Sequence, residues 1–277
     1  MIARMTGAAL RGVLVALMVL TPALYLPSSI TNSTEIAVFL AILAFALTFA
    51  EYNSAFPSFI EFRDAPPLNR IRFITLITMV SFLTLICKQV YAPTNVTALV
   101  SGLGHLVTHL ADFPYSPVRL VVLMLPDQVD LTLVNMVRTA AGVSYVMALA
   151  MVLGFFYLIR IRNWPTGNGA FNVWVNLPLF DPTTGGDVIA RLQRDGRINV
   201  VAGILLPFLI PAVVKVAADF IDPIMLTNPQ TLIWTMCGWA FLPASMVMRG
   251  MAMLRIADLI EAKRRRAYSN AEAMPAA

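Results

Sequence analysis

The hydrophobic residues of this chain gather in six long stretches from which charged side chains are almost absent. The stretches cover residues 12–29, 36–50, 73–91, 139–159, 198–218 and 232–248. A helix that crosses a bilayer needs about 20 mostly apolar residues, so each stretch reaches or approaches spanning length. The second has only 15 residues between Glu35 and Glu51, and it spans only if both carboxylates reach the lipid headgroups. The pattern predicts an all-α membrane protein, a polytopic bundle of about six transmembrane helices.

Basic residues divide unevenly between the two sides of these spans. With the N-terminus in the cytoplasm, 16 of the 20 Lys and Arg residues fall on the cytoplasmic side, where flanking segments retain positive charge. The residues left outside are Lys88, Arg119, Arg138 and Lys215. We therefore expect both termini in the cytoplasm, in a multi-pass protein of the cell inner (cytoplasmic) membrane.

The first span has the charge pattern of a signal peptide, because Arg4 and Arg11 precede an apolar run. No small-x-small cleavage site follows that run, so we expect the span to be retained. Cleavage would leave five spans with the same cytoplasmic C-terminus. The loops are too short to fold alone, which predicts a single helical transmembrane domain over 1–266. Residues 267–277 are expected to form a disordered cytoplasmic tail.

Composition supports the membrane assignment. The chain is 58% hydrophobic and 13% charged, about half the charge of a soluble domain, which excludes a soluble enzyme and a disulfide-stapled secreted domain. The net charge of +5 includes the run Lys263, Arg264, Arg265 and Arg266 after the last span. Such a run is typical of a contact with anionic lipid headgroups, so no nucleic-acid partner is expected. Cys87 and Cys237 lie in apolar runs, where we expect buried free thiols.

The long segment between the third and fourth spans contains an amphipathic helix. Its apolar residues follow helical spacing: Val96, Leu99, Val100, Leu103, Val107 and Leu110. We expect this helix to lie in the outer interface with its polar side wet. His105 and His109 share one side, with Asp112 three residues on, so these three are candidate metal ligands. The apolar run 120–126 is too short to span and either dips into the membrane or covers the bundle.

The two inner loops carry the remaining candidate residues. Residues 171–176 alternate apolar and polar, which predicts a short extended segment. Residues 187–193 are expected to form a short helix that Asp195 and Gly196 end. The candidates for a partner interface are Glu61, Arg63, Asp64, Trp174, Asp181 and Arg191.

The spans carry no ionisable side chain near their middle, which argues against an ion-coupled transporter or a proton channel. The phosphate-binding motif of ATP-driven proteins is also missing from the sequence, and no cofactor is expected. The favoured interpretation is a non-enzymatic accessory, assembly or scaffold component, with the lipid bilayer and other membrane-protein subunits as partners. One alternative is a channel or carrier for a neutral or lipophilic solute that uses the proline-broken fifth and sixth spans. A second alternative is a membrane enzyme that modifies lipid with its polar loop residues.

Overall fold

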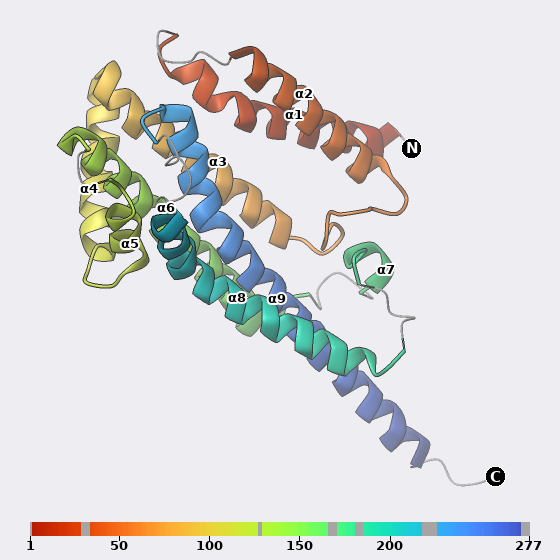
Figure 1. Ribbon diagram of the computed structural model, residues 1–277. Helices are drawn as coiled ribbons and strands as arrows, with labels where there is room; N and C mark the ends of the chain where they lie inside the picture. The colour runs from red at the N-terminus through yellow and green to blue at the C-terminus, as the bar shows by residue number, and fades with distance from the viewer. Residues whose placement is uncertain are drawn as a thin grey trace.

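In the computed structural model, residues 2–28, 34–126, 129–165, 171–180, 185–217 and 226–272 are described. These residues form helices joined by turns, without strands (Figure 1). The helices are α1 (Ile2–Tyr25), α2 (Thr34–Asn53), α3 (Leu68–Tyr91), α4 (Asn95–Ala111), α5 (Pro117–Leu123), α6 (Leu131–Arg160), α7 (Val173–Asn176), α8 (Val188–Ala217) and α9 (Pro229–Glu272). Among them α1, α2, α3, α6, α8 and α9 are long and apolar enough to cross a membrane. This confirms the all-α class and the six predicted stretches.

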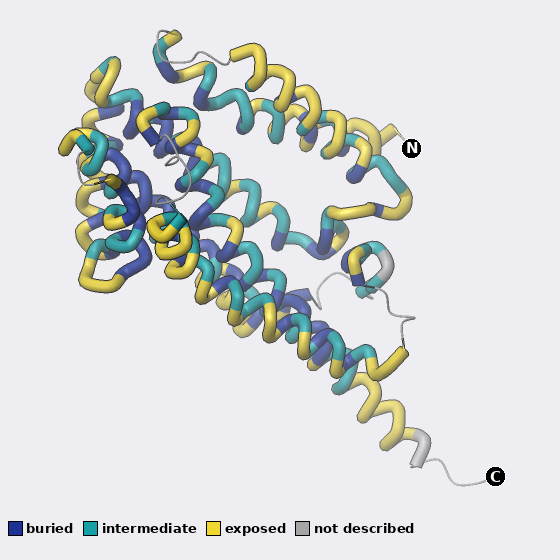
Figure 2. Tube along the Cα trace, viewed as in Figure 1, coloured by how far each residue is buried: buried dark blue, intermediate teal, exposed yellow. Residues whose placement is uncertain are grey.

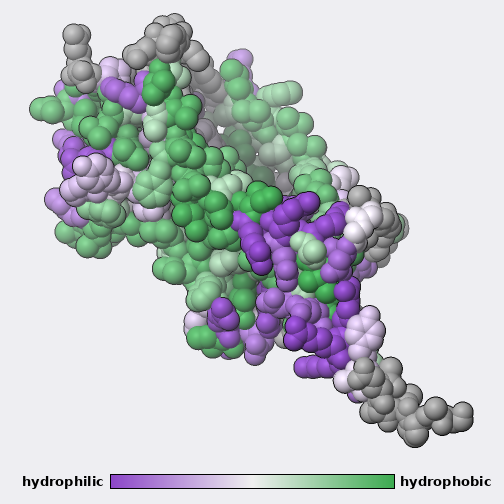
Figure 3. Space-filling view, turned by 60° about the horizontal axis from the view of Figure 1, so that its bottom comes forward, coloured by the Kyte–Doolittle hydropathy of each residue, from purple (hydrophilic) through white to green (hydrophobic). Residues whose placement is uncertain are grey.

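Charged side chains mark one end of the bundle, which we call the charged end. It is formed where α1, α3 and α8 begin and where α2 and α6 finish. Figure 3 shows hydrophilic side chains gathered there, beside a largely hydrophobic surface. Helix α9 has 44 residues, a length of about 66 Å against a hydrocarbon core of about 30 Å. It therefore projects past the charged end, and residues 267–272, the start of the expected tail, are helical.

Helices α3, α6 and α9 enclose the centre of the hydrophobic core, the dark blue region of Figure 2. Cys87 and Cys237 are buried there as free thiols, as predicted. Helices α1 and α2 form a hairpin beside this core, and α2 packs mainly on α1, where Gly12 lies against the ring of Phe45. Most of the surface of α2 is exposed and apolar. In a spanning helix such a surface faces lipid or another helix.

The expected helix stop at Asp195 and Gly196 is wrong, because α8 runs through both residues. Gly196 lies where α8 crosses α9: a Cβ on Gly250 would come 2.5 Å from the carbonyl oxygen of Gly196. Glycine at this position allows the two backbones to meet. A glycine that ends a helix and one that packs a helix look the same in a single sequence.

The segment between α3 and α6 packs on the bundle in a way that the leucine pattern does not indicate. Helix α4 buries the side that carries its smaller residues, which include Gly104 and Thr108. It leaves Leu99, Leu103 and Leu110 exposed. Gly104 contacts Thr139 of α6. Helix α5, which contains the first part of the run 120–126, packs on α6 and α8, so this part of the run covers the bundle. Its depth in the membrane stays a prediction. The position of α4 in the membrane interface stays a prediction.

The extended segment expected at 171–176 is also wrong, because residues Val173–Asn176 form the single turn α7. The backbone N–H of Leu177 donates to the carbonyl of Val173, a local bond that alternation of side chains does not reveal. The alternating pattern is short enough to fit either structure.

The contact between α8 and α9 gives a stability prediction. Gly250→Ala places a methyl group against the Gly196 carbonyl, and overpacking of this kind costs about 1–3 kcal/mol. Gly238→Ala is the matched control on the same helix, since nothing lies within 4 Å of its added Cβ. We expect a lower Tm in detergent for Gly250→Ala and an unchanged or higher Tm for Gly238→Ala. Equal Tm values for the two variants would contradict the packing.

Candidate functional site

The loop of residues 54–67, between α2 and α3, lies at the charged end and contains three of the predicted interface residues. The central contact is an ion pair between Glu61 of the loop and Arg249 of α9. Arg249 donates from Nε to Glu61 Oε2 at 2.5 Å and from Nη2 to Oε1 at 2.8 Å. The Glu61 side chain is only 6% exposed. This two-point geometry joins the loop to the middle of the longest helix.

A second arginine lies close to this pair. Arg72 of α3 donates from Nη2 to the carbonyl of Ser245 on α9 at 2.7 Å, and the charges of Glu61 and Arg249 both act on it. One carboxylate therefore balances two guanidinium groups between α3 and α9. Removal of that carboxylate would leave two partly buried like charges close to each other.

Glu51 lies in the last turn of α2, and its side chain turns into the loop that follows. Its expected depth at the lipid headgroups stays a prediction. Its carboxylate accepts from the backbone N–H groups of Ser58, Phe59 and Ile60 at 3.0–3.1 Å. The residue is 5% exposed. It satisfies backbone donors that an irregular segment beside the membrane would otherwise leave unpaired.

Arg63 performs the complementary task for backbone acceptors. Its Nη1 donates to the carbonyls of Glu51 at 3.0 Å and Ser54 at 2.8 Å, and its Nε pairs with Asp64 at 3.1 Å. The side chain of Arg63 is 7% exposed, while that of Asp64 is 56% exposed. Arg63 is thus a structural cation that closes the turn after α2.

Two distant segments complete the loop. Asn176 of α7 accepts from the N–H of Phe62 with its carbonyl at 2.6 Å and from that of Asp64 with Oδ1 at 3.0 Å. Trp164, after α6, donates from Nε1 to the carbonyl of Pro66 at 3.1 Å. Phe62 is fully buried at a φ of 55°, a conformation that costs energy for a bulky residue. These bonds hold it in place.

The predicted interface residues therefore separate into groups. Glu61, Arg63 and Asp64 come together, and they do so as parts of one hydrogen-bonded loop. Arg191 of α8 lies elsewhere, with its guanidinium 4.8 Å from the ring centre of Phe180. Trp174 belongs to α7, but its side chain is outside the described part of the structure, as is Asp181 altogether.

Sequence reasoning missed the partners Glu51, Arg72, Trp164, Asn176 and Arg249. Each lies at the edge of a predicted span or in a short polar segment. A charged or amide side chain at such a position is usually expected to face solvent. The available signal was the clustering of such residues at the same predicted side of the membrane. This clustering identifies the side of the membrane on which the residues lie, but it does not identify which residues bond to each other.

At the opposite end, the proposed metal ligands make other contacts. Asp112 pairs with Arg119 of α5 at 2.7 Å and with Arg138 of α6 at 3.4 Å. His105 Nδ1 lies 3.1 Å from Thr139 Oγ1, and His109 is exposed. Within the described ranges no three His, Cys, Asp or Glu side chains are placed to hold a metal ion. The geometry assigns Asp112 the role of an ion-pair anchor between α4, α5 and α6.

The basic run lies on the projecting part of α9, where all four side chains are exposed. Arg264 donates to Asp187, just before α8, at 3.0 Å, and this bond lowers the pKa of the Asp187 carboxyl below its ordinary value. Arg265 pairs with Glu261 one turn away. Contact between Lys263–Arg266 and lipid headgroups stays a prediction.

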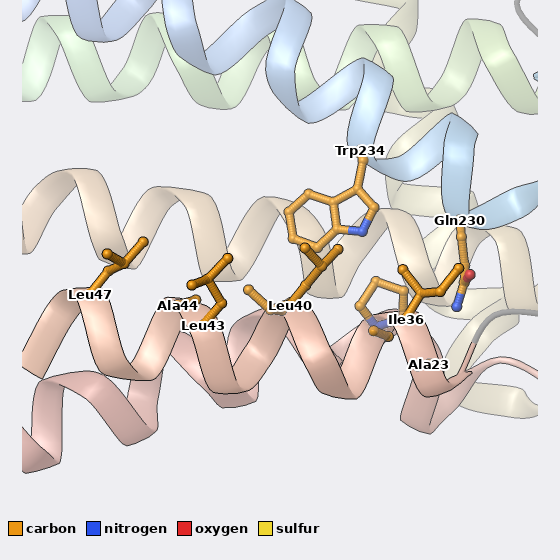
Figure 4. A pocket seen from close by; sticks show the side chains of 11 residues that line it. Ala23, Ile36, Leu40, Leu43, Ala44, Leu47, Gln230 and Trp234 are labelled. Atoms are coloured by element: carbon orange, nitrogen blue, oxygen red, sulfur yellow. The ribbon is translucent and has the colours of Figure 1, made fainter.

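An apolar groove of about 460 Å³ opens between the α1–α2 hairpin and the start of α9. Figure 4 shows Trp234 of α9 pointing across it toward Leu40 of α2. The residues that line it are Val19, Pro22, Ala23, Ile36, Ala37, Leu40, Leu43, Ala44, Leu47, Gln230 and Trp234. Sequence reasoning could not find it, because its walls come from three spans whose packing a single sequence does not specify.

Comparison of the chain with protein-family models, with curated proteins and with solved structures finds no match. The fold and the contacts described above are therefore the basis for a function.

The ion pair at the charged end gives the second stability prediction. Glu61→Gln leaves Arg249 and Arg72 without their shared anion, and a broken buried pair costs about 3–5 kcal/mol. The matched control is Glu261→Gln, which breaks the exposed pair with Arg265 and should cost under about 1 kcal/mol. The measurement is the free energy of unfolding in detergent micelles. The same small loss in both variants would show that Glu61 does not hold the loop.

Proposed function

We propose that this protein is a non-enzymatic accessory, assembly or scaffold component of a complex in the cytoplasmic membrane. Its α1–α2 hairpin would present the apolar groove to a transmembrane helix of a partner subunit. The groove between the hairpin and α9 is the observation that carries this proposal.

The shape and lining of the groove favour a helix as the occupant. Along α2 it runs from Ile36 to Leu47, about 16 Å or three helical turns. Ala23, Ala37 and Ala44 line it, and small residues allow helix backbones to approach closely in a membrane. Helix α2 also has little of its own surface covered by the rest of the chain. A spanning helix from another subunit would cover it.

The charged loop supports assembly over catalysis. The carboxylates and guanidinium groups of Glu51, Glu61 and Arg63 bond to backbone groups or to Arg249. These bonds fix the loop, and a lipid-modifying enzyme would need such groups directed at its substrate. The groove is lined almost entirely by apolar side chains, which suits an apolar helix and, among the solutes of the alternative function, favours only a lipophilic one.

The groove gives a test with a matched pair on one helix. Ala44→Phe fills the groove, whereas Ala46→Phe adds the same side chain at an exposed position of α2 outside it. Overpacking costs about 1–3 kcal/mol, so recovery of a partner with Ala44→Phe should fall by roughly fivefold or more. Recovery with Ala46→Phe should match wild type. Affinity purification in mild detergent with mass spectrometry measures it.

A photo-crosslinking side chain at Leu43 identifies the occupant directly. A crosslink to one other membrane protein, absent when the probe is at the outward-facing Val213 of α8, supports the proposal. Crosslinks to lipid alone, to a second copy of this chain, or to no partner would each overturn it.

The orientation is part of the same proposal, with both termini in the cytoplasm. The distribution of Lys and Arg between the two ends supports it. Tyr268 on projecting α9 and Tyr115 at the opposite end are 65% and 87% exposed, while the native Cys87 and Cys237 are buried. Single cysteines at these tyrosines therefore report the side of the membrane with little background.

We expect a membrane-impermeant maleimide to label Tyr115→Cys in intact cells and Tyr268→Cys only after permeabilisation. The two variants serve as controls for each other, because each should be labelled in permeabilised cells. The reverse pattern would place both termini outside.

A further inference from the structure

A polar pocket of about 370 Å³ lies at the charged end, between the start of α1, the end of α2 and the loop 54–67. Three arginines, Arg4, Arg11 and Arg63, line it together with Tyr52 and Asp64. The pocket volume corresponds to about a dozen water molecules. It is separate from the apolar groove and shares no lining residue with it.

The charges of this pocket do not balance. Asp64 pairs with Arg63, whose other donors bond to backbone carbonyls. Arg4 and Arg11 remain, and neither forms an ion pair with a carboxylate in the described ranges. The start of α1 adds its own partial positive charge and free N–H groups. The pocket is therefore cationic.

Tyr52 contacts both arginines that lack a carboxylate partner in the described part of the chain. The Nε of Arg4 donates to the Tyr52 carbonyl at 3.4 Å, and the guanidinium carbon of Arg11 lies 4.7 Å from the centre of the Tyr52 ring. Arg11 also donates from Nη1 to the carbonyl of Gly7 at 2.8 Å. Both side chains are exposed, so most of their donors are available to a ligand.

The position of the pocket favours a lipid headgroup as the anion. Arg11 precedes the uncharged part of α1 and Tyr52 follows the apolar run of α2, a level at which tyrosines and headgroups meet. Exposed Leu10, Val13 and Leu14 continue along α1 from the pocket, where acyl chains would lie. Guanidinium groups bind phosphate through paired N–H donors, and basic pockets of this kind bind anionic headgroups.

We propose that the pocket of Arg4, Arg11 and Arg63 binds the headgroup phosphate of an anionic phospholipid. Arg4 and Arg11 would donate to the phosphate oxygens, and Arg63 would supply fixed positive charge from behind. This site is distinct from the basic run on α9 and does not depend on the partner proposed for the groove.

The test measures binding of phosphatidylglycerol to the delipidated full chain in detergent, by native mass spectrometry, with phosphatidylcholine as the neutral comparison. Arg4→Gln/Arg11→Gln should weaken phosphatidylglycerol binding roughly 30-fold. Arg160→Gln/Arg162→Gln removes the same charge from two exposed positions at the charged end, the last residue of α6 and a residue just after it, and should change phosphatidylglycerol binding little. An equal loss in both double variants would overturn the site in favour of diffuse attraction.

A third variant separates the shape of the pocket from its charge. Gly7→Leu keeps every arginine, but its side chain enters the pocket, since even a Cβ at Gly7 would lie 3.0 Å from Arg11 Nη1. We expect it to lose phosphatidylglycerol while its elution in gel filtration stays that of the wild type. Wild-type affinity for the lipid in Gly7→Leu would overturn the proposal.

Inorganic phosphate distinguishes a lipid from a free anion. Phosphate added at millimolar concentration should leave phosphatidylglycerol bound, because it lacks the acyl chains that contact α1. Displacement of the lipid at that concentration would overturn the lipid assignment and identify a site for a soluble anion. Equal binding of phosphatidylcholine and phosphatidylglycerol would also overturn it.

Discussion

Backbone N–H and C=O groups beside a membrane must find partners within the protein, and the rest of this structure depends on how that constraint is met after α2. The spanning helices meet it by themselves. The loop 54–67 does not, because it is irregular and packed against the bundle. Its donors bond to the Glu51 carboxylate and to Asn176, and its acceptors bond to Arg63 and Trp164. Side chains of α2, of α7, of Trp164 after α6 and of the loop itself thus replace bonds that a helix would make.

Ion pairs join the helices at both ends of the bundle, and the more extensive network lies at the charged end. Glu61, Arg72 and Arg249 join the loop, α3 and α9 where these elements meet. A buried ion pair of this kind contributes little net stability compared with a hydrophobic contact, but its loss is costly. Its two-point geometry fixes where the loop meets α9. Because the middles of the spans carry no charge, charged side chains contribute to the packing only at the ends of the bundle.

The sequence predicts the six spans and the clustering of charge because both depend on local composition. It does not predict the ends of helices or the choice of partners. Gly196 has the pattern of a stop and acts as a contact with Gly250. Residues 171–176 alternate like a strand and form a turn of helix. Glu51 has the pattern of a headgroup contact and is buried beneath a loop. The deciding contacts are a neighbouring helix for Gly196, a local backbone bond for residues 173–177 and the following loop for Glu51. Hydrophobic periodicity registers none of these contacts.

The α1–α2 hairpin has few buried residues, and both the apolar groove and the arginine pocket lie on it. Its position relative to the core depends on the clamp between Glu51, Arg63 and the loop at one end, and on contacts of α1 with α3 and α9. The groove lies along its apolar side, and the arginine pocket lies where that clamp closes. A ligand in the pocket would therefore act on the segment that positions the groove. If the hairpin binds a partner helix, the binding of a lipid in the pocket would change the affinity of the groove for that helix. The loop 54–67 would connect the two sites.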